Sequence, residues 1–226
     1  GFNAQRLAQL GARLTVIDLA ANAVRLTLER FALRGLRADF VVADAEHLPF
    51  ASSAFEMIFS SGVIHHSPDT SAAAREIARV LASGGAATVM IYNRDSIWFW
   101  WNIVIGLGAL MFVLNALSSA LREQLLVTRP AWRNLIMPAG QRLTLNDVIR
   151  AGTDFGGLQN PISRVYTRAS AQRLFQGLTD FNFVTGFNRY HALDSNPSFF
   201  TRAARIVLDW LDDRWGWFLI AKASKP

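Results

Sequence analysis

The feature that most constrains this chain is a pair of short apolar runs, each of which ends on an aspartate. The first run ends on Asp18 and the second on Asp44, and a segment with helical spacing, residues 20–33, lies between them. A run, a helix and a second run at this spacing predict a βαβ unit, whose strands are parallel. Ligands of open α/β sheets bind at the carboxyl ends of such strands. Each aspartate alone also fits a turn or a helix cap, but two on successive strands favour ligand binding.

Beyond that unit the alternation continues, with one long interruption. Further strand candidates lie at 55–61, 86–92, 181–187 and 215–222, and helix candidates at 3–10, 71–81 and 169–178. This order predicts an α/β fold with a parallel sheet covered by helices. The interruption, residues 94–160, is predicted to be an apolar and helical insertion or lid. It separates a cofactor-binding half, 1–93, from the C-terminal half of the same domain, 161–226.

The composition excludes several chemistries. The chain has no cysteine, which excludes disulfides, thiolate zinc sites and cysteine nucleophiles, and we expect no metal site. The net charge of +6 comes almost wholly from arginine, because the only lysines are Lys222 and Lys225. A P-loop lysine and a Schiff-base lysine in the body of the chain are therefore excluded. The arginines are scattered and no nucleic-acid-binding signature occurs, so we expect no nucleic-acid partner.

Four stretches, taken together, resemble the class I S-adenosylmethionine-dependent methyltransferases, in the type 11 small-molecule branch that includes the ubiquinone-biosynthesis enzymes. They stand in the family's order with ordinary gaps: Thr15–Leu19, Val42–Phe50, Phe55–Asp69 and Arg75–Gly85. The resemblance covers residues 1 to about 92 well, the last strand adequately and 93–180 weakly. It implies a Rossmann-like, mostly parallel sheet with an antiparallel C-terminal strand at 215–222. It also implies S-adenosylmethionine as cofactor, and that the family's first strand and most of its glycine loop precede Gly1.

The same resemblance implies roles for individual residues. Gly1 is expected to be the last glycine of the loop that passes under the methionine part of the cofactor. Asp18 is expected to bind the ribose hydroxyls, since one carboxylate can accept hydrogen bonds from both hydroxyls of a diol. Asp44 and Ala45 are expected to meet the adenine edge. Ser60 is expected to lie beside the methionine part.

Four polar residues are candidates for the acceptor side of the reaction. Methyl transfer needs an aligned acceptor and a dry site, and it needs a base only if the acceptor carries a proton. His65 and His66 follow the strand candidate at 55–61 and are the candidate bases, with a structural role as the alternative. Arg164 and Tyr166 are candidates for binding an anionic or hydroxyl-bearing acceptor. Their alternatives are a surface arginine and a packed tyrosine.

Residues 97–117 carry no charge and are long enough to cross a membrane. A single crossing would place strands of one sheet on opposite sides of a membrane, so we exclude it. Three interpretations stay open: a buried lid over the acceptor pocket, a helix in the membrane interface, or a re-entrant hairpin broken at 106–108. Tryptophans near one end favour contact with the interface: Trp98, Trp100 and Trp101. Arginines that follow would add attraction to an anionic leaflet: Arg122, Arg129, Arg133 and Arg142.

The function predicted from the sequence is methyl transfer to a small-molecule or lipid-linked acceptor, by a cytoplasmic protein with peripheral contact to the membrane. One alternative is a non-catalytic, membrane-apposed domain that kept the methyltransferase fold. Another is a nicotinamide-dependent reductase, which shares the βαβ start but normally has a Tyr-x-x-x-Lys pair. The residues four positions after Tyr92, Tyr166 and Tyr190 are instead Ser96, Ser170 and Asp194.

Overall fold

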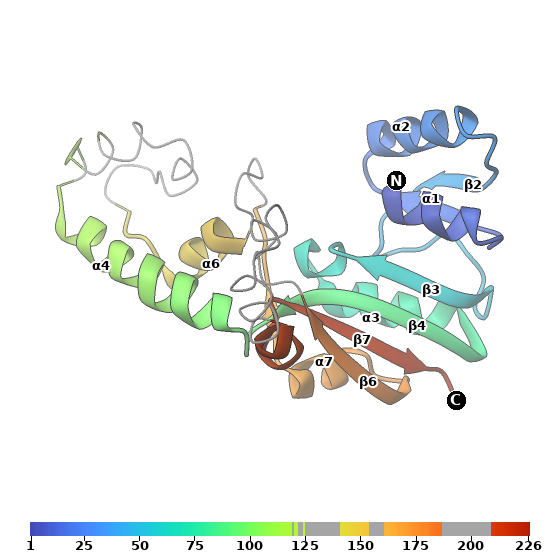
Figure 1. The fold of residues 1–226 in the computed structure, drawn as a ribbon. Helices are drawn as coiled ribbons and strands as arrows, with labels where there is room; N and C mark the ends of the chain where they lie inside the picture. Colours follow the sequence, from blue (N-terminus) through green and yellow to red (C-terminus); the bar gives the residue numbers. More distant parts are fainter. Residues whose placement is uncertain (119, 122–123, 125–140, 154–160, 187–208) are drawn as a thin grey trace, which may run out of the picture.

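The computed structural model describes residues 1–118, 120–121, 124, 141–153, 161–186 and 209–226. Helices and strands alternate along most of this part, and an apolar arm interrupts the alternation (Figure 1). The elements in chain order are α1 (Phe2–Gln9), β1 (Thr15–Asp18), α2 (Ala21–Ala32), β2 (Asp39–Val42), β3 (Phe55–Ser61), η1 (Ile64–His66), α3 (Thr70–Val80), β4 (Leu81–Asn93), η2 (Trp98–Leu107), α4 (Gly108–Ala116), α6 (Leu145–Thr153), β5 (Val165–Tyr166), α7 (Arg168–Leu174), β6 (Thr179–Gly186) and β7 (Phe218–Ser224).

The predicted βαβ unit is present at the start of the chain. Strands β1 and β2 pair in parallel, with Asp18 opposite Val42, and α2 connects them. The apolar side of α2 packs on the strands through Phe31, which is 1% exposed. The ring of Phe31 meets that of Phe40 in β2 edge to face, with centroids 5.3 Å apart. This packing fixes both strand ends at the same edge of the sheet.

The second sheet has five strands. Its order is β3-β4-β7-β6, and the short β5 pairs with the end of β4. Strands β3 and β5 run parallel to β4, whereas β7 runs antiparallel to both β4 and β6. The sequence analysis is thereby confirmed in its mostly parallel sheet and its antiparallel closing strand, which begins three residues later than predicted, at Phe218.

The main core lies between this sheet and two helices, α3 and α7. Every second residue of β7 is buried from Leu219 to Ala223, as expected for a strand with one covered face. Helix α3 contributes Ile77 and the segment after α7 contributes Phe175, which is 1% exposed. Figure 1 shows both helices on the same side of the strands. This core holds β3 and β4, whose carboxyl ends lead to the candidate site.

The sequence analysis expected one continuous sheet, and the described residues form two. In the described part of the chain no strand pairs with the second edge of β1, and none pairs with the corresponding edge of β3. The two sheets are therefore separated where β1 and β3 would each need a further partner.

The insertion contributes one long apolar helix. It starts as a π-helix, η2, and continues without a break into α4. The hydroxyl of Ser96 accepts a hydrogen bond from the backbone N–H of Phe99 at 3.0 Å and caps its start. Because Gly106 and Gly108 lie inside the continuous helix, the re-entrant hairpin is wrong. Trp98–Ala116 is long and apolar enough to span a membrane, and 17% of its residues are buried.

Helix α6 packs across this arm. A Cβ at Gly152 would lie 2.8 Å from side-chain carbons of both Ile103 and Leu107, so glycine is needed for the close approach. The boundaries predicted at 93 and 160 stay predictions. Several residues singled out in the sequence lie outside the described part: Arg122, Arg129, Arg133, Tyr190 and Asp194.

Candidate functional site

Asp18 and Asp44 lie at neighbouring strand ends, as the sequence predicted. Asp18 is the last residue of β1, and Asp44 follows β2 by two residues. One carboxylate oxygen of Asp18 accepts from the backbone N–H of Ala20, and one of Asp44 accepts from that of Glu46, both at 2.9 Å. Within the described residues, the second oxygen of each carboxylate accepts no hydrogen bond. Each aspartate can therefore bind a hydroxyl or amine while it holds its turn.

Gly1 lies at the N-cap of α1, where its carbonyl accepts from the N–H of Gln5 at 3.0 Å. A Cβ at this position would lie 2.8 Å from Oγ1 of Thr27 in α2. Glycine is needed here because the start of α1 approaches α2 closely. This contact accounts for the glycine, and its expected role at the cofactor stays a prediction.

The loop after β2, which carries Asp44 and Ala45, is tied to α3. Both oxygens of Glu76 accept from the guanidinium of Arg79 at 2.7 Å, and one also accepts from the N–H of Leu48 at 2.8 Å. Arg79 in turn donates to the carbonyls of Leu48 at 3.0 Å and Phe50 at 2.7 Å. The hydrogen bonds from Arg79 lower the pKa of Glu76 below its ordinary value. The pair fixes the path of the loop, and with it the position of Asp44.

The end of β3 and the short η1 helix bring Ser60 and the two histidines to the same edge. Ser60 is partly buried opposite Val89 of β4. Gly62 then has φ +74°, which a side chain would resist, and the chain turns there into η1.

His65 is fully buried, at 0% exposure. The centroid of its ring lies 4.1 Å from those of His66 and of Tyr92. Among the described residues, neither ring nitrogen has a hydrogen-bond partner. Burial, and to a smaller extent His66, lowers the pKa of His65 to about 3. Because an acceptor cannot reach these nitrogens in this structure, the geometry favours the structural alternative for His65.

His66 is only partly buried and is held by the segment that precedes β5. Its Nδ1 lies 2.8 Å from the carbonyl oxygen of Ile162 and 3.2 Å from the hydroxyl of Ser163. The expected base role stays a prediction, and His66 is the better placed of the two histidines.

Arg164 and Tyr166 are engaged inside the protein. The guanidinium of Arg164 donates to the carbonyls of Ser67 and Pro68 and to the hydroxyl of Thr70. Tyr166 is hydrogen-bonded to Thr70 as well, and burial raises its pKa, so the phenol stays protonated. These contacts fasten the loop after η1 to β5. They give both residues a structural role, and acceptor binding by either stays a prediction.

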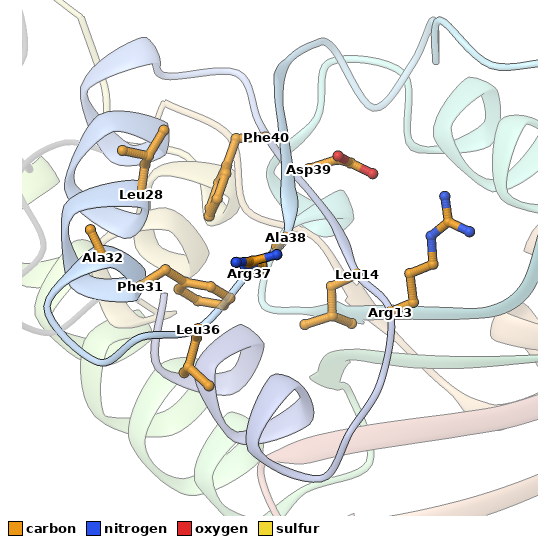
Figure 2. Close-up of a pocket in the computed structure, with 10 residues that line it drawn as sticks. All are labelled: Arg13, Leu14, Leu28, Phe31, Ala32, Leu36, Arg37, Ala38, Asp39 and Phe40. Carbon is orange, nitrogen blue, oxygen red and sulfur yellow. The ribbon is translucent and has the colours of Figure 1, made fainter.

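A cavity of about 540 Å³ lies elsewhere, at the amino ends of β1 and β2 (Figure 2). Leu28 and Phe31 of α2 and Phe40 of β2 line it, together with Arg13 and Arg37. Ligands of parallel sheets bind at the opposite, carboxyl ends of the strands. The cavity is therefore separate from the site marked by the two aspartates.

Three further side chains belong to the scaffold of the site and were missed from the sequence. Glu46 accepts from the N–H of Asp69 at 2.7 Å and joins the loop after β2 to the start of α3. Thr153 donates to Ser163 at 2.7 Å, next to His66. The contacts span 10 to 97 positions in sequence, so no local pattern reveals them. In the described residues no group of three or more potential ligands is placed to hold a metal ion.

The chain can now be compared with known proteins. Residues 1–89 match a family model described as a methyltransferase domain. Over these residues the chain is similar to the class I S-adenosylmethionine-dependent methyltransferases. A bifunctional biotin-biosynthesis protein, BioHC of Cellvibrio japonicus, is 37% identical over 89 residues, which are 39% of this chain and 17% of that protein. The ubiquinone/menaquinone biosynthesis C-methyltransferase UbiE of Rhizobium meliloti is 34% identical over 85 residues, 37% of this chain and 33% of that enzyme.

Solved structures extend the likeness in fold beyond the matched residues. A methyltransferase from Thermotoga maritima superposes with a TM-score of 0.56 at 13% identity, covering 99% of this chain and 77% of the other. Phosphoethanolamine N-methyltransferase 2 of Haemonchus contortus, in complex with S-adenosyl-L-methionine, gives 0.56 at 16% identity and covers 100% of this chain and 46% of the other. The chain spans about a third or less of the length of the curated relatives that it matches.

Proposed function

We propose that this chain forms a methyltransferase domain that transfers a methyl group from S-adenosylmethionine to a small, lipid-type acceptor. The observation that carries the proposal is the pair of aspartates at the carboxyl ends of adjacent parallel strands. One carboxylate oxygen of each accepts no hydrogen bond from the residues that the structure describes. When bound, the cofactor supplies a methyl group already activated on a sulfonium sulfur. The protein then has to hold the acceptor in line and keep water out.

Each part of the cofactor would have its own set of contacting residues. Asp18 would hold the ribose hydroxyls through its free oxygen, since it is exposed at the end of β1. Asp44 and Ala45 would meet the adenine, with their loop held by Glu76. Gly1 and Ser60 would border the methionine part, one at the start of α1 and the other near the end of β3.

A lipid-type acceptor is supported by the apolar arm. Trp101 and Phe112 are 69% and 78% exposed, although both lie in the most apolar helix of the described chain. Exposed tryptophan side chains favour a membrane interface, where the ring contacts hydrocarbon and the N–H group stays in contact with water. The arm begins five residues after β4, whose carboxyl end belongs to the site. Two relatives are named for a sterol and for ubiquinone/menaquinone biosynthesis, both lipophilic classes. The protein would then be cytoplasmic and peripheral at the membrane.

Flotation with anionic liposomes tests the acceptor class. The full-length protein is expected to float at low salt, and a double variant, Trp101→Ser with Phe112→Ser, is expected to stay at the bottom of the gradient. Trp210→Ser is the matched control, because Trp210 is also exposed, at 58%, and lies outside the arm. If the unmodified protein fails to float, the arm does not bind membranes and the lipid-type acceptor is wrong.

Cofactor binding is tested separately, by titrating S-adenosylhomocysteine and NADH into the full-length protein. We expect saturable binding of S-adenosylhomocysteine and no binding of NADH. Binding of neither would indicate the non-catalytic domain, and binding of NADH alone would indicate the reductase.

A further inference from the structure

The contacts of His66 define which of its ring nitrogens carries a proton. Nδ1 lies 2.8 Å from the carbonyl oxygen of Ile162, and a carbonyl can only accept a hydrogen bond. Nδ1 must therefore carry a hydrogen for this contact to be favourable. In a neutral imidazole the other nitrogen, Nε2, then has a free lone pair.

A second oxygen is compatible with the same assignment. The hydroxyl of Ser163 lies 3.2 Å from Nδ1 and accepts a hydrogen bond from Thr153 at 2.7 Å. Thr153 is the last residue of α6, the helix that packs on the apolar arm. Ser163 can accept from Thr153 and from Nδ1 together, since a hydroxyl oxygen has two lone pairs.

The position of His66 relative to these oxygens is fixed by Arg164. Its backbone N–H donates to the carbonyl of His65 at 3.1 Å, and its guanidinium donates to the carbonyl of Pro68 at 2.8 Å. The segment that carries Ile162 and Ser163 is thus fastened on both sides of His66. Within the described residues Nε2 makes no hydrogen bond, and the residue is only partly buried.

We infer that His66 is the proton acceptor of the reaction, through Nε2, and that Ser163 and Thr153 are positioning residues that keep Nδ1 protonated. The inference rests on the proposed function and narrows the acceptor to a group that loses a proton, such as a hydroxyl. The bond from the acceptor atom to the methyl carbon forms as the carbon–sulfur bond breaks, with its electron pair left on sulfur. The acceptor's proton passes to Nε2, and the resulting imidazolium returns it to water.

NMR of the full-length protein labelled with ¹⁵N-histidine tests the assignment directly, because long-range ¹H–¹⁵N correlations distinguish a protonated ring nitrogen from an unprotonated one. At a pH where the ring is neutral, His66 is expected to be protonated at Nδ1 alone. Ser163→Ala and Thr153→Val are each expected to raise the fraction protonated at Nε2 at least twofold. A predominantly Nε2-protonated ring in the unmodified protein would overturn the inference, as would a tautomer that neither variant changes.

Acylation by diethyl pyrocarbonate tests whether Nε2 is accessible, since the reagent attacks unprotonated imidazole nitrogens. Peptide mass spectrometry is expected to find His66 modified, with at least tenfold less modification when S-adenosylhomocysteine saturates the protein. His65 is the internal control, because both of its nitrogens are buried. Lack of reaction at His66 would give it a structural role. Calorimetry with S-adenosylhomocysteine on the same sample shows whether cofactor binding itself fails, so the two failures are distinguishable.

Discussion

The core around α3, β4 and β7 and the apolar arm Trp98–Ala116 are both rich in large apolar side chains, yet they place them differently. In the core, Phe175 and Leu219 are at most 1% exposed. In the arm, Phe112 is 78% exposed. Apolar side chains are stable where another apolar surface covers them. The two regions therefore differ in what covers their apolar side chains. The core finds its partner within the chain, and we infer that the arm finds its partner in a lipid surface.

The largest difference is expected from phenylalanine-to-alanine changes in the two regions. Phe175→Ala should lower the free energy of unfolding by about 3–5 kcal/mol, because it removes a buried ring and leaves a cavity. Phe112→Ala should lower it by less than about 0.5 kcal/mol, because that ring is exposed. Urea denaturation of both variants measures the two values. Equal losses would mean that the arm packs as a core and that the comparison is wrong.

A smaller effect is expected where polar contacts hold the site. Glu76→Ala should cost about 1.5–3 kcal/mol of stability, because hydrogen bonds to Arg79 and to the N–H of Leu48 are lost. The pKa of Glu76 is lowered in the folded protein, so its contribution is present above the ordinary value of 4.5 and is lost as the pH falls through the folded pKa.

The matched control for Glu76 is Glu29→Ala. Glu29 also pairs with an arginine on a helix, Arg25, but the two side chains are 51% and 59% exposed. A surface pair of this kind contributes less than about 0.5 kcal/mol. If the two variants lose the same stability, the loop after β2 is not held through Glu76.

A pH-dependent change in stability is expected at His65. Its pKa is lowered to about 3 in the folded protein, from 6.5, so unfolding takes up a proton between these values. Stability should therefore fall as the pH is lowered from 6.5 towards 4, by up to about 1.4 kcal/mol per pH unit for one proton. His65→Phe should flatten this dependence, and His47→Phe, at an exposed loop position, should not. An unchanged slope in the His65→Phe variant would show that His65 is not buried and neutral.

Local sequence patterns were sufficient for much of the fold. The alternation of apolar runs and helices located the βαβ unit, and the acids at strand ends located Asp18 and Asp44 within it. The βαβ unit and the positions of the two aspartates follow from the spacing of apolar residues along the chain, which distinguishes helices from strands. The length of the apolar arm was also predictable: the charge-free segment 97–117 corresponds to the helix Trp98–Ala116 in the structure.

The side-chain roles required tertiary structure. The sequence could not separate His65 from His66, because adjacent residues in a short helix can be buried to different extents. The side chains of His66 and Arg164 contact residues that lie 94 to 97 positions away in the chain. The division of the strands into two sheets was also not predicted. The alternation of strands and helices along the chain does not show which strands pair with one another.

Calorimetric titration of S-adenosylhomocysteine into the full-length protein tests the central claim most directly. The unmodified protein should bind with saturation, and Asp18→Ala should weaken binding by about 1.5–3 kcal/mol, roughly 10- to 150-fold in Kd. Asp39→Ala is the matched control, because Asp39 is an exposed acid at the opposite end of β2, and its affinity should be unchanged. Saturable binding that Asp18→Ala leaves intact, or no saturable binding at all, would contradict a cofactor site at the carboxyl ends of β1 and β2.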